Sequence, residues 1–352
     1  MSNPSQPSPA QLGYAMPAEW RTHEATWLAW PKDPITWPDR VALVQNIFLE
    51  MISRLSAEER VELLVDDGPT EQDVRNRLGG FRVHLSNVRF HRIPTVDSWI
   101  RDYGPNFLLN AETRQLAFNH WIFNAWGGKY EELKRDTDVP FKITALLDVP
   151  RFTPGIVLEG GSIEVNGAGI CMTTEQCLLN PNRNPDLSRA DLEGQLRAHL
   201  GVSRILWLGE GIIGDDTDGH IDDIARFVRS DTIVAAVEDD PADENYKVLQ
   251  DNLRRLECAT DLSGKPFNLV LLPMPGPVEG SDGRLPASYA NFYIANGTVL
   301  VPLFGHRNDE KALEILRSVF PGRTVAGLHC EPLVWGLGTI HCVTQQQPGR
   351  GW

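Results

Sequence analysis

The sequence predicts an α/β fold, because segments with helical periodicity alternate with short apolar segments typical of strands. A second observation supports this class: a strand–turn–strand pattern recurs at similar intervals along the chain. A third is that no Pro/Gly/Ser-rich linker divides the sequence. Together these observations predict one domain built from repeated units.

Helices are expected where apolar residues recur at three- and four-residue spacings, at 38–56, 187–199, 243–256 and from Asn308 to Val319. Ser188 is a suitable N-cap for the second helix, and Gly201 follows its end. Pro321 and Gly322 end the fourth. Strands are expected at the apolar segments 61–67, 204–209, 268–275 and 298–305.

The recurrence places a chemically reactive or acidic residue ahead of each strand–turn–strand pattern. These positions are separated by roughly 50 to 70 residues, and they are Asp102, Glu159, His220, Tyr289 and Cys342. Asn, Gly, Ser or Asp occupies the turn positions, as hairpins require. Five such units would close into a ring around a central site, although they share no residue identity.

The predicted domain organisation is a flexible N-terminal tail at 1–13 and a single catalytic domain at 14–352. The tail, MSNPSQPSPAQLG, is rich in Ser, Pro and Gln and has no basic start or apolar stretch, so it does not resemble a targeting signal. No apolar segment approaches the length of a membrane-spanning helix. Five cysteines without framework spacing favour reduced thiols and a cytoplasmic protein.

The net charge of −14 argues against a nucleic-acid partner, because binding to phosphates requires a basic surface. A negative surface attracts small cations, which would suit a cationic substrate. The same charge could also serve only to keep the protein in solution. Charge alone therefore excludes one class of partner without identifying another.

The densest group of polar residues is GDDTDGHIDDIARF at 214–227. A histidine moves protons near neutral pH, and paired carboxylates can hold a planar guanidinium through two hydrogen bonds. If the segment after His220 is extended, His220 and Asp222 point to the same face. The spacing does not fit a calcium loop, because Gly214 and Ala225 occupy the first and twelfth positions. A transition-metal site stays open as an alternative.

Cys342 is the candidate nucleophile. Gly336 and Gly338 precede it in WGLGTIHCVTQQQP, and they allow close approach of the backbone before a strand-like segment. A free cysteine is most often a small buried apolar residue, which is the interpretation for the other four. Together with a separate Asp/His cluster, Cys342 fits a thiolate nucleophile.

Two further turns carry candidate carboxylates. Asp102 stands before Gly104 in DSWIRDYGPNF, and Glu159 precedes two glycines in VLEGGSIEV. Either residue alone could be an ordinary turn carboxylate. Most tryptophans are expected to pack the core, and Trp99 is the best candidate for a pocket wall.

Six segments in order carry a family resemblance: MPAEWRTHEATWLAWP (16–31), WIRDYGP (99–105), LEGGS (158–162), TDGHID (217–222), ANFYIANG (290–297) and GTIHCVTQQQP (338–348). The chain resembles the agmatine deiminase and bacterial peptidylarginine deiminase group of guanidine-modifying enzymes. The resemblance implies the pentein fold, a five-bladed α/β propeller with pseudo-fivefold symmetry. It covers nearly the whole chain.

The resemblance also implies roles for the candidate residues. Cys342 would be the nucleophile, His220 the proton shuttle, and Asp102 and Asp222 the guanidinium clamp. Glu159 would orient His220 or add to the clamp. Trp99 and Gly338 are expected to border the substrate, and neither a metal nor an organic cofactor is needed.

The implied reaction is hydrolysis of agmatine to N-carbamoylputrescine and ammonia through a covalent amidino-thioether on cysteine. A homo-oligomer and a place in polyamine and putrescine biosynthesis are implied in the same way. Two departures bear on the substrate tail. Leu337 interrupts the usual glycine run before the cysteine, and Asp218 replaces a common Asn.

Three alternatives stay open at this point. The same chemistry could act on free or peptidyl arginine. The chain could be a non-catalytic guanidine-binding protein, although a pure binder has no need of Cys342 with His220. It could also be a metal-dependent hydrolase built on 215–223.

Overall fold

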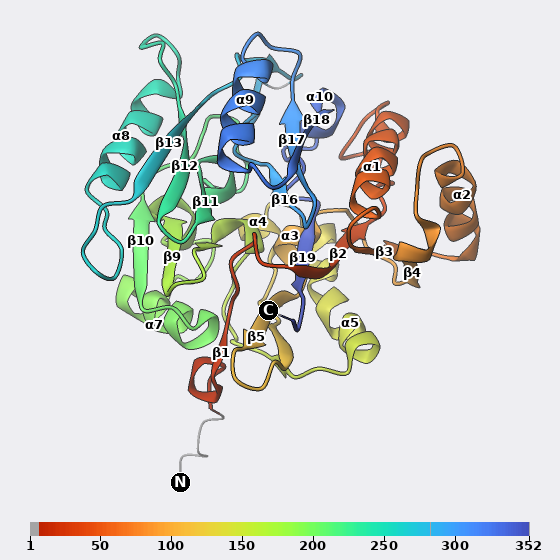
Figure 1. Ribbon diagram of the computed structural model, residues 1–352, viewed down its shortest axis with the longest axis horizontal. Coiled ribbons are helices and arrows are strands. Elements are labelled where there is room, and N and C mark those ends of the chain that lie inside the picture. The colour runs from red at the N-terminus through yellow and green to blue at the C-terminus, as the bar shows by residue number, and fades with distance from the viewer. Residues whose placement is uncertain (1–6, 282, 352) are drawn as a thin grey trace.

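The computed structural model describes residues 7–281 and 283–351, and within them it has five sheets of three or four strands plus one short hairpin. Longer helices lie toward the periphery of the view, and the short α3 (Ile100–Tyr103) and α4 (Ala125–Gly128) lie near its centre (Figure 1). The predicted α/β class is confirmed.

Four of the sheets share one connectivity: an antiparallel pair followed by a parallel strand. The first contains β5 (Asn106–Asn110), β6 (Leu116–Asn119) and β7 (Arg151–Phe152), extended by β1 (Tyr14–Ala15). The second contains β8 (Glu164–Val165), β9 (Ile170–Thr174) and β10 (Arg204–Leu208). The third contains β11 (Ala225–Arg229), β12 (Thr232–Val237) and β13 (Asn268–Pro273). The fourth contains β16 (Tyr293–Ile294), β17 (Thr298–Leu303) and β18 (Thr324–His329).

The fifth sheet joins the two ends of the sequence. The last strand, β19 (Gln345–Pro348), pairs antiparallel with β2 (His23–Ala29), which is followed by the parallel strands β3 (Arg60–Val65) and β4 (Val88–Arg92). The antiparallel pair of this unit is therefore assembled from opposite ends of the chain. The separate hairpin consists of β14 (Val278–Glu279) and β15 (Arg284–Leu285).

Helices occupy the connections between the parallel strands, as such crossovers require. They are α1 (Val41–Leu55), α2 (Gly68–Leu78), α5 (Val139–Leu147), α7 (Arg189–Leu200), α8 (Tyr246–Glu257) and α9 (Asp309–Val319). The shorter elements are α6 (Glu175–Leu178), α10 (Glu331–Val334) and the 3-10 helices η1 (Ala10–Leu12), η2 (Leu85–Asn87), η3 (Glu131–Asp138), η4 (Gly160–Ser162) and η5 (Ile221–Asp223).

The predicted helices and strands are confirmed within a few residues. Helix α7 begins at a capping box in which the Ser188 hydroxyl accepts a hydrogen bond from the Asp191 backbone, and it ends at Gly201 with φ of 66°. The predicted strands correspond to β3, β10, β13 and β17. Trp27 and Trp37 are fully buried, in agreement with a core role for most tryptophans.

Each antiparallel pair follows a turn that carries one of the recurring residues. Asp102 lies in α3, Glu159 precedes η4, and His220 precedes η5. One local prediction was wrong, because Cys342 lies in a turn before β19 instead of on a strand-like segment. Residues 221–223 form a 3-10 turn, so the condition of an extended segment after His220 is not met. A turn places side chains at the inner end of a sheet, where a continuing strand would alternate them between its faces.

The predicted tail lies partly outside the described residues. Within 7–13, η1 packs near the first sheet, where the Leu12 carbonyl accepts a hydrogen bond from the Asn110 amide at 2.8 Å. The division into a tail and a single domain stays a prediction. Among the described residues, no helix is both long and apolar enough to cross a membrane.

Candidate active site

A cavity of about 180 Å³ reaches the turns that carry Asp102 and Cys342. Its walls are largely aromatic and apolar, from Ile35, Trp99, Trp126, Trp335 and Leu337. Its acidic members are Asp33, Asp102, Glu132 and Asp216. The described lining residues include no lysine or arginine. The cavity therefore combines flat apolar walls with negative charge.

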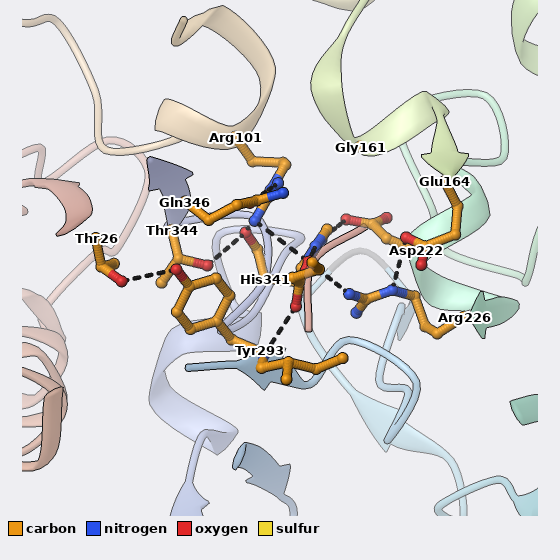
Figure 2. Close-up of polar contacts among 12 residues, drawn as sticks. Thr26, Arg101, Gly161, Glu164, Asp222, Arg226, Tyr293, His341, Thr344 and Gln346 are labelled. Carbon is orange, nitrogen blue, oxygen red and sulfur yellow. Dashed lines mark hydrogen bonds and ion pairs between the residues drawn. The ribbon is translucent and has the colours of Figure 1, made fainter. Parts of the chain in front are cut away.

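The predicted site residues converge beside Gly161. A Cβ atom added there would lie 2.5 Å from His220 Nδ1, 2.9 Å from Asp102 Oδ1 and 3.1 Å from Asp222 Oδ2. Figure 2 shows Gly161 close to Asp222 at the inner end of the glycine turn. Two turns that are distant in sequence thus place a base and two carboxylates around Gly161, which lies on a third turn.

Asp102 is buried and held by two donors. The Trp126 indole donates to Oδ2 at 2.9 Å, and the Gly161 backbone donates to Oδ1 at 2.9 Å. Burial, followed by the charges of Asp222 and Glu159, raises the pKa of Asp102 well above its usual value. Without a bound cation, this carboxyl group therefore favours its protonated form.

His220 is a neutral imidazole at pH 7, because burial lowers its pKa to about 3. Its Nδ1 lies 3.7 Å from Asp102 Oδ1, so this nitrogen faces the two carboxylates. Its Nε2 and the Glu159 Oε2 atom have no hydrogen-bond partner in the described part of the chain. One ring nitrogen of His220 and one carboxylate oxygen of Glu159 lie within 4.8 Å of each other, so Glu159 is a close neighbour of the imidazole.

Cys342 is buried beside the remaining carboxylate. Its Sγ lies 3.2 Å from the Asn291 amide nitrogen and 3.9 Å from Asp222 Oδ2. Burial, with the charges of Asp222, Asp223 and Asp102, raises the pKa of the thiol well above its usual value. In the free protein Cys342 is therefore a neutral thiol.

The two carboxylate oxygens of Asp222 differ in their hydrogen bonding. Its Oδ2 contacts His341 Nδ1 at 2.7 Å, while Oδ1 is buried without a hydrogen-bond partner among the described residues. Burial acts to raise its pKa, but the hydrogen bond and charge of His341 lower it below the usual value. Asp222 is therefore an ionised carboxylate with one free acceptor.

Sequence reasoning missed Arg183, which supports Glu159 from behind. Its Nε donates to Glu159 Oε1 at 2.7 Å, and Nη1 donates to Asp218 Oδ2. Asp218 also pairs with Lys129 at 2.9 Å and does not line the cavity. Asp218, which replaces the Asn common in the family pattern, thus belongs to a charge network behind His220. Arg183 lies in PNRNP, a segment with no recognisable catalytic motif.

Both predicted border residues, Trp99 and Gly338, line the cavity. A Cβ at Gly338 would lie 2.7 Å from the Trp99 ring and 3.2 Å from Cys342 Sγ, so only glycine leaves room between wall and thiol. Leu337, at the second departure, has φ of 68°, in the left-handed region that favours glycine. Trp126 and Trp335 form walls that the sequence did not single out.

One group of side chains resembles part of a metal site. Single ligand atoms of Glu159, Cys177 and His220 lie within 4.8 Å of one another. The guanidinium of Arg183 already contacts Glu159 at 2.7 Å, and its positive charge would oppose a cation at that point. The expectation that the chemistry needs no metal or organic cofactor stays a prediction.

Residues 15–348 match the family model described as Porphyromonas-type peptidyl-arginine deiminase. An agmatine deiminase of Medicago truncatula is 37% identical, over 97% of this chain and 98% of that protein. The structure of an Enterococcus faecalis agmatine deiminase has a TM-score of 0.92 and 33% identity, with 100% of both chains covered. A C. jejuni agmatine deiminase solved with substrate bound has a TM-score of 0.85 and 30% identity, covering 95% of this chain and 96% of that one. These likenesses confirm the predicted fold class.

Proposed function

Because the chain belongs to the Porphyromonas-type peptidyl-arginine deiminase family, together with curated agmatine deiminases, we propose that it hydrolyses agmatine to N-carbamoylputrescine and ammonia. The observation that carries this proposal is the convergence of Cys342, His220, Asp102 and Asp222 at the inner end of one acidic cavity.

Binding begins with the guanidinium. Asp222 offers its free Oδ1 atom, and Asp102 becomes an acceptor when the incoming cation displaces its proton. The guanidinium then lies between two carboxylates, against the aromatic walls of the cavity. Water does not solvate the buried sulfur of Cys342, but the positive charge of the guanidinium stabilises its thiolate form and so lowers the pKa of the thiol. His220 is neutral at pH 7, so substrate charge, and not a histidinium, activates the thiol.

The covalent steps use the thiol proton. His220 accepts this proton, and Cys342 Sγ forms a bond to the guanidinium carbon. The imidazolium gives the proton to one terminal nitrogen, the C–N bond breaks, and ammonia leaves. An amidino-thioether remains on Cys342. Burial raises the pKa of Glu159, and the Arg183 guanidinium opposes this effect. Once the imidazolium forms nearby, its charge favours the ionised form of Glu159, which in turn stabilises the imidazolium.

Hydrolysis returns the enzyme to its starting state. Neutral His220 accepts a proton from water, the water oxygen bonds to the amidino carbon, and a tetrahedral intermediate forms. The C–S bond then breaks, and His220 gives its proton to sulfur. The hydroxyl proton of the intermediate passes to Asp102, which regains the proton displaced on binding, and the neutral ureido product leaves. Oxygen from water thus replaces one guanidinium nitrogen.

The carboxylates that line the cavity in addition to Asp102 favour agmatine over free arginine. Asp33, Glu132 and Asp216 line it, and the primary ammonium of agmatine would meet these carboxylates. The α-carboxylate of arginine would meet the same charges and would be repelled. The substrate that this argument selects is a small dication.

Other features of the proposal come from the family resemblance and the sequence. They are a homo-oligomer, a role in polyamine and putrescine biosynthesis, a cytoplasmic location and the absence of nucleic-acid and membrane partners. The net charge of −14 supports the expectation on nucleic acid.

The test is ammonia release from agmatine, free arginine and a blocked peptidyl-arginine, each with and without a metal chelator. Chelator-insensitive release from agmatine alone is expected. Release only from another guanidine would change the substrate and keep the mechanism. Loss of activity with chelator would contradict the metal-free scheme. A Cys342→Ser variant should show no covalent adduct by mass spectrometry, and an adduct on another cysteine would move the nucleophile.

A further inference from the structure

A buried network of charged side chains lies behind the active site and outside its cavity. Arg226, fully buried, donates to Glu164 Oε2 at 3.0 Å and to Glu19 Oε2 at 2.8 Å. Glu19 Oε1 also accepts from the Ile294 backbone at 2.8 Å. Figure 2 shows His341 close to Asp222, with Arg226 and Glu164 on the same side of His341. Glu19 comes from the MPAEW segment, which the proposed mechanism does not use.

His341 bridges two carboxylates. Its Nδ1 lies 2.7 Å from Asp222 Oδ2, and its Nε2 lies 2.7 Å from Glu19 Oε2. Ionised carboxylates only accept hydrogen bonds, so both ring nitrogens must donate. Glu19 is ionised, because the Arg226 guanidinium, with Nη2 at 2.8 Å from Oε2, opposes the effect of burial, and the pKa of Glu19 is well below its usual value. The ring is therefore an imidazolium, next in sequence to the nucleophile.

From this geometry, and resting on the proposed function, we infer that His341 is a positioning residue for the guanidinium clamp. Its positive charge keeps Asp222 ionised, and its hydrogen bond fixes Oδ2, so that Oδ1 faces the substrate. Glu19 and Arg226 hold the ring from its other side. His341 touches neither the cavity nor the reacting atoms, and it acts through Asp222.

The surroundings of Asp222 explain why a cation is required there. Asp102, Asp215 and Asp223 face it as acidic groups, with the Cys342 thiol beside them. Neutral His220 and the more distant Arg226 offer limited compensation.

The other face of His341 is also charged. Glu19 contacts the ring, Glu164 lies beyond Arg226, and the Arg101 Nε donates to the His341 carbonyl at 3.2 Å. Without the imidazolium, Asp222 would be one more carboxyl in a buried acidic group and would take up a proton.

Two substitutions separate the two hydrogen bonds of the ring. The amide of His341→Asn places a donor near the position of Nδ1, toward Asp222, whereas His341→Gln places one near Nε2, toward Glu19. We expect His341→Gln to lower kcat/KM for agmatine about 100-fold at neutral pH and to move the acidic limb of the pH profile upward. His341→Asn should lose about tenfold, because it keeps a donor to Asp222.

The pH profile distinguishes positioning from structural support. Equal losses in the two variants with an unchanged acidic limb would overturn the inference, as would near-normal activity in both. If the wild-type protein releases no ammonia from agmatine, the proposed function fails instead, whatever the variants do.

A spectroscopic test uses the folded protein without a change at 341. In protein carrying ¹⁵N-labelled histidine, His341 should show two slowly exchanging ring N–H protons, one donated to each carboxylate. His23 is the matched control, because its ring also lies between acceptors, at 3.4 Å from Glu59 and 2.6 Å from the Glu19 carbonyl. The His23→Gln variant removes the signal of His23, so the two ring N–H protons that remain in its spectrum should belong to His341. If this variant shows no ring with two N–H protons, His341 is not an imidazolium.

Discussion

Adding one methyl group at Gly161 should disable the site while leaving the fold intact. Gly161 has no positive φ, so its backbone conformation accepts alanine. Its amide would still donate to Asp102. The new Cβ, however, would stand at 2.5 Å from His220 Nδ1, where ordinary contact begins at 3.4 Å. The imidazole must therefore move by about 0.9 Å, and the Asp102 and Asp222 oxygens by smaller amounts.

A displacement of this size is large for catalysis. A misplacement of about 1 Å can cost about 100-fold in rate, which corresponds to about 2.7 kcal/mol. We therefore expect kcat/KM of Gly161→Ala for agmatine to fall by about 100-fold. The assay is ammonia release under steady-state conditions, with thermal unfolding measured on the same samples.

Gly194→Ala is the matched control. Gly194 lies in α7, and an added Cβ there has no heavy atom within 4 Å. This variant should retain full activity and gain about 0.5–1 kcal/mol of stability, because alanine favours a helix over glycine. If Gly161→Ala instead unfolds cooperatively near the wild-type temperature and keeps kcat/KM within about threefold of wild type, the convergence at Gly161 is not the reacting geometry.

Three further outcomes follow from the same contacts. In Cys342→Ser, agmatine binding should release protons to the buffer and tighten as pH rises, because Asp102 is protonated when free and ionised when it holds the cation; calorimetry in two buffers measures this release. Arg183→Gln should destabilise the protein by about 3–5 kcal/mol, since it leaves Glu159 buried without its partner; denaturant unfolding checks it, and an unchanged midpoint would contradict the pairing. The Leu337→Gly variant should have a free energy of unfolding about 1 kcal/mol higher than Leu337→Ala, because φ at this position is 68°; denaturant unfolding of the two variants measures the difference.

The repeating architecture was predictable because each unit has local signals. Turn residues between apolar segments predicted the hairpins β5–β6, β8–β9, β11–β12 and β16–β17, and the structure contains all of them. Closure of the fifth sheet was not predictable. Its partners, Trp27 and Gln345, are far apart in sequence, and no local propensity encodes their pairing.

The site residues that could be predicted are those whose residue type and sequence motif indicate a reaction. Residue type, glycine-rich turns and the family resemblance led to Cys342, His220 and the three carboxylates, and the structure brings these residues close together, while their roles stay predictions. Arg183 could not be found, because its function arises only when PNRNP folds against Glu159. The sequence also did not decide the backbone at 221–223, where the structure has a short 3-10 turn.

The charge balance explains why the free enzyme can carry a buried thiol among carboxyl groups. Burial favours the neutral forms of Cys342, Asp102 and His220, so the free site holds little net charge beyond the pair of Asp222 with His341. A guanidinium changes this balance, since it stabilises the ionised forms of Asp102 and Cys342 at once. A neutral ligand of the same shape gives no such stabilisation and leaves the thiol protonated. The same electrostatic effect of the guanidinium therefore selects a cationic ligand and activates the nucleophile. The reactivity of Cys342 toward alkylating reagents should accordingly depend on whether a cation lies between Asp102 and Asp222.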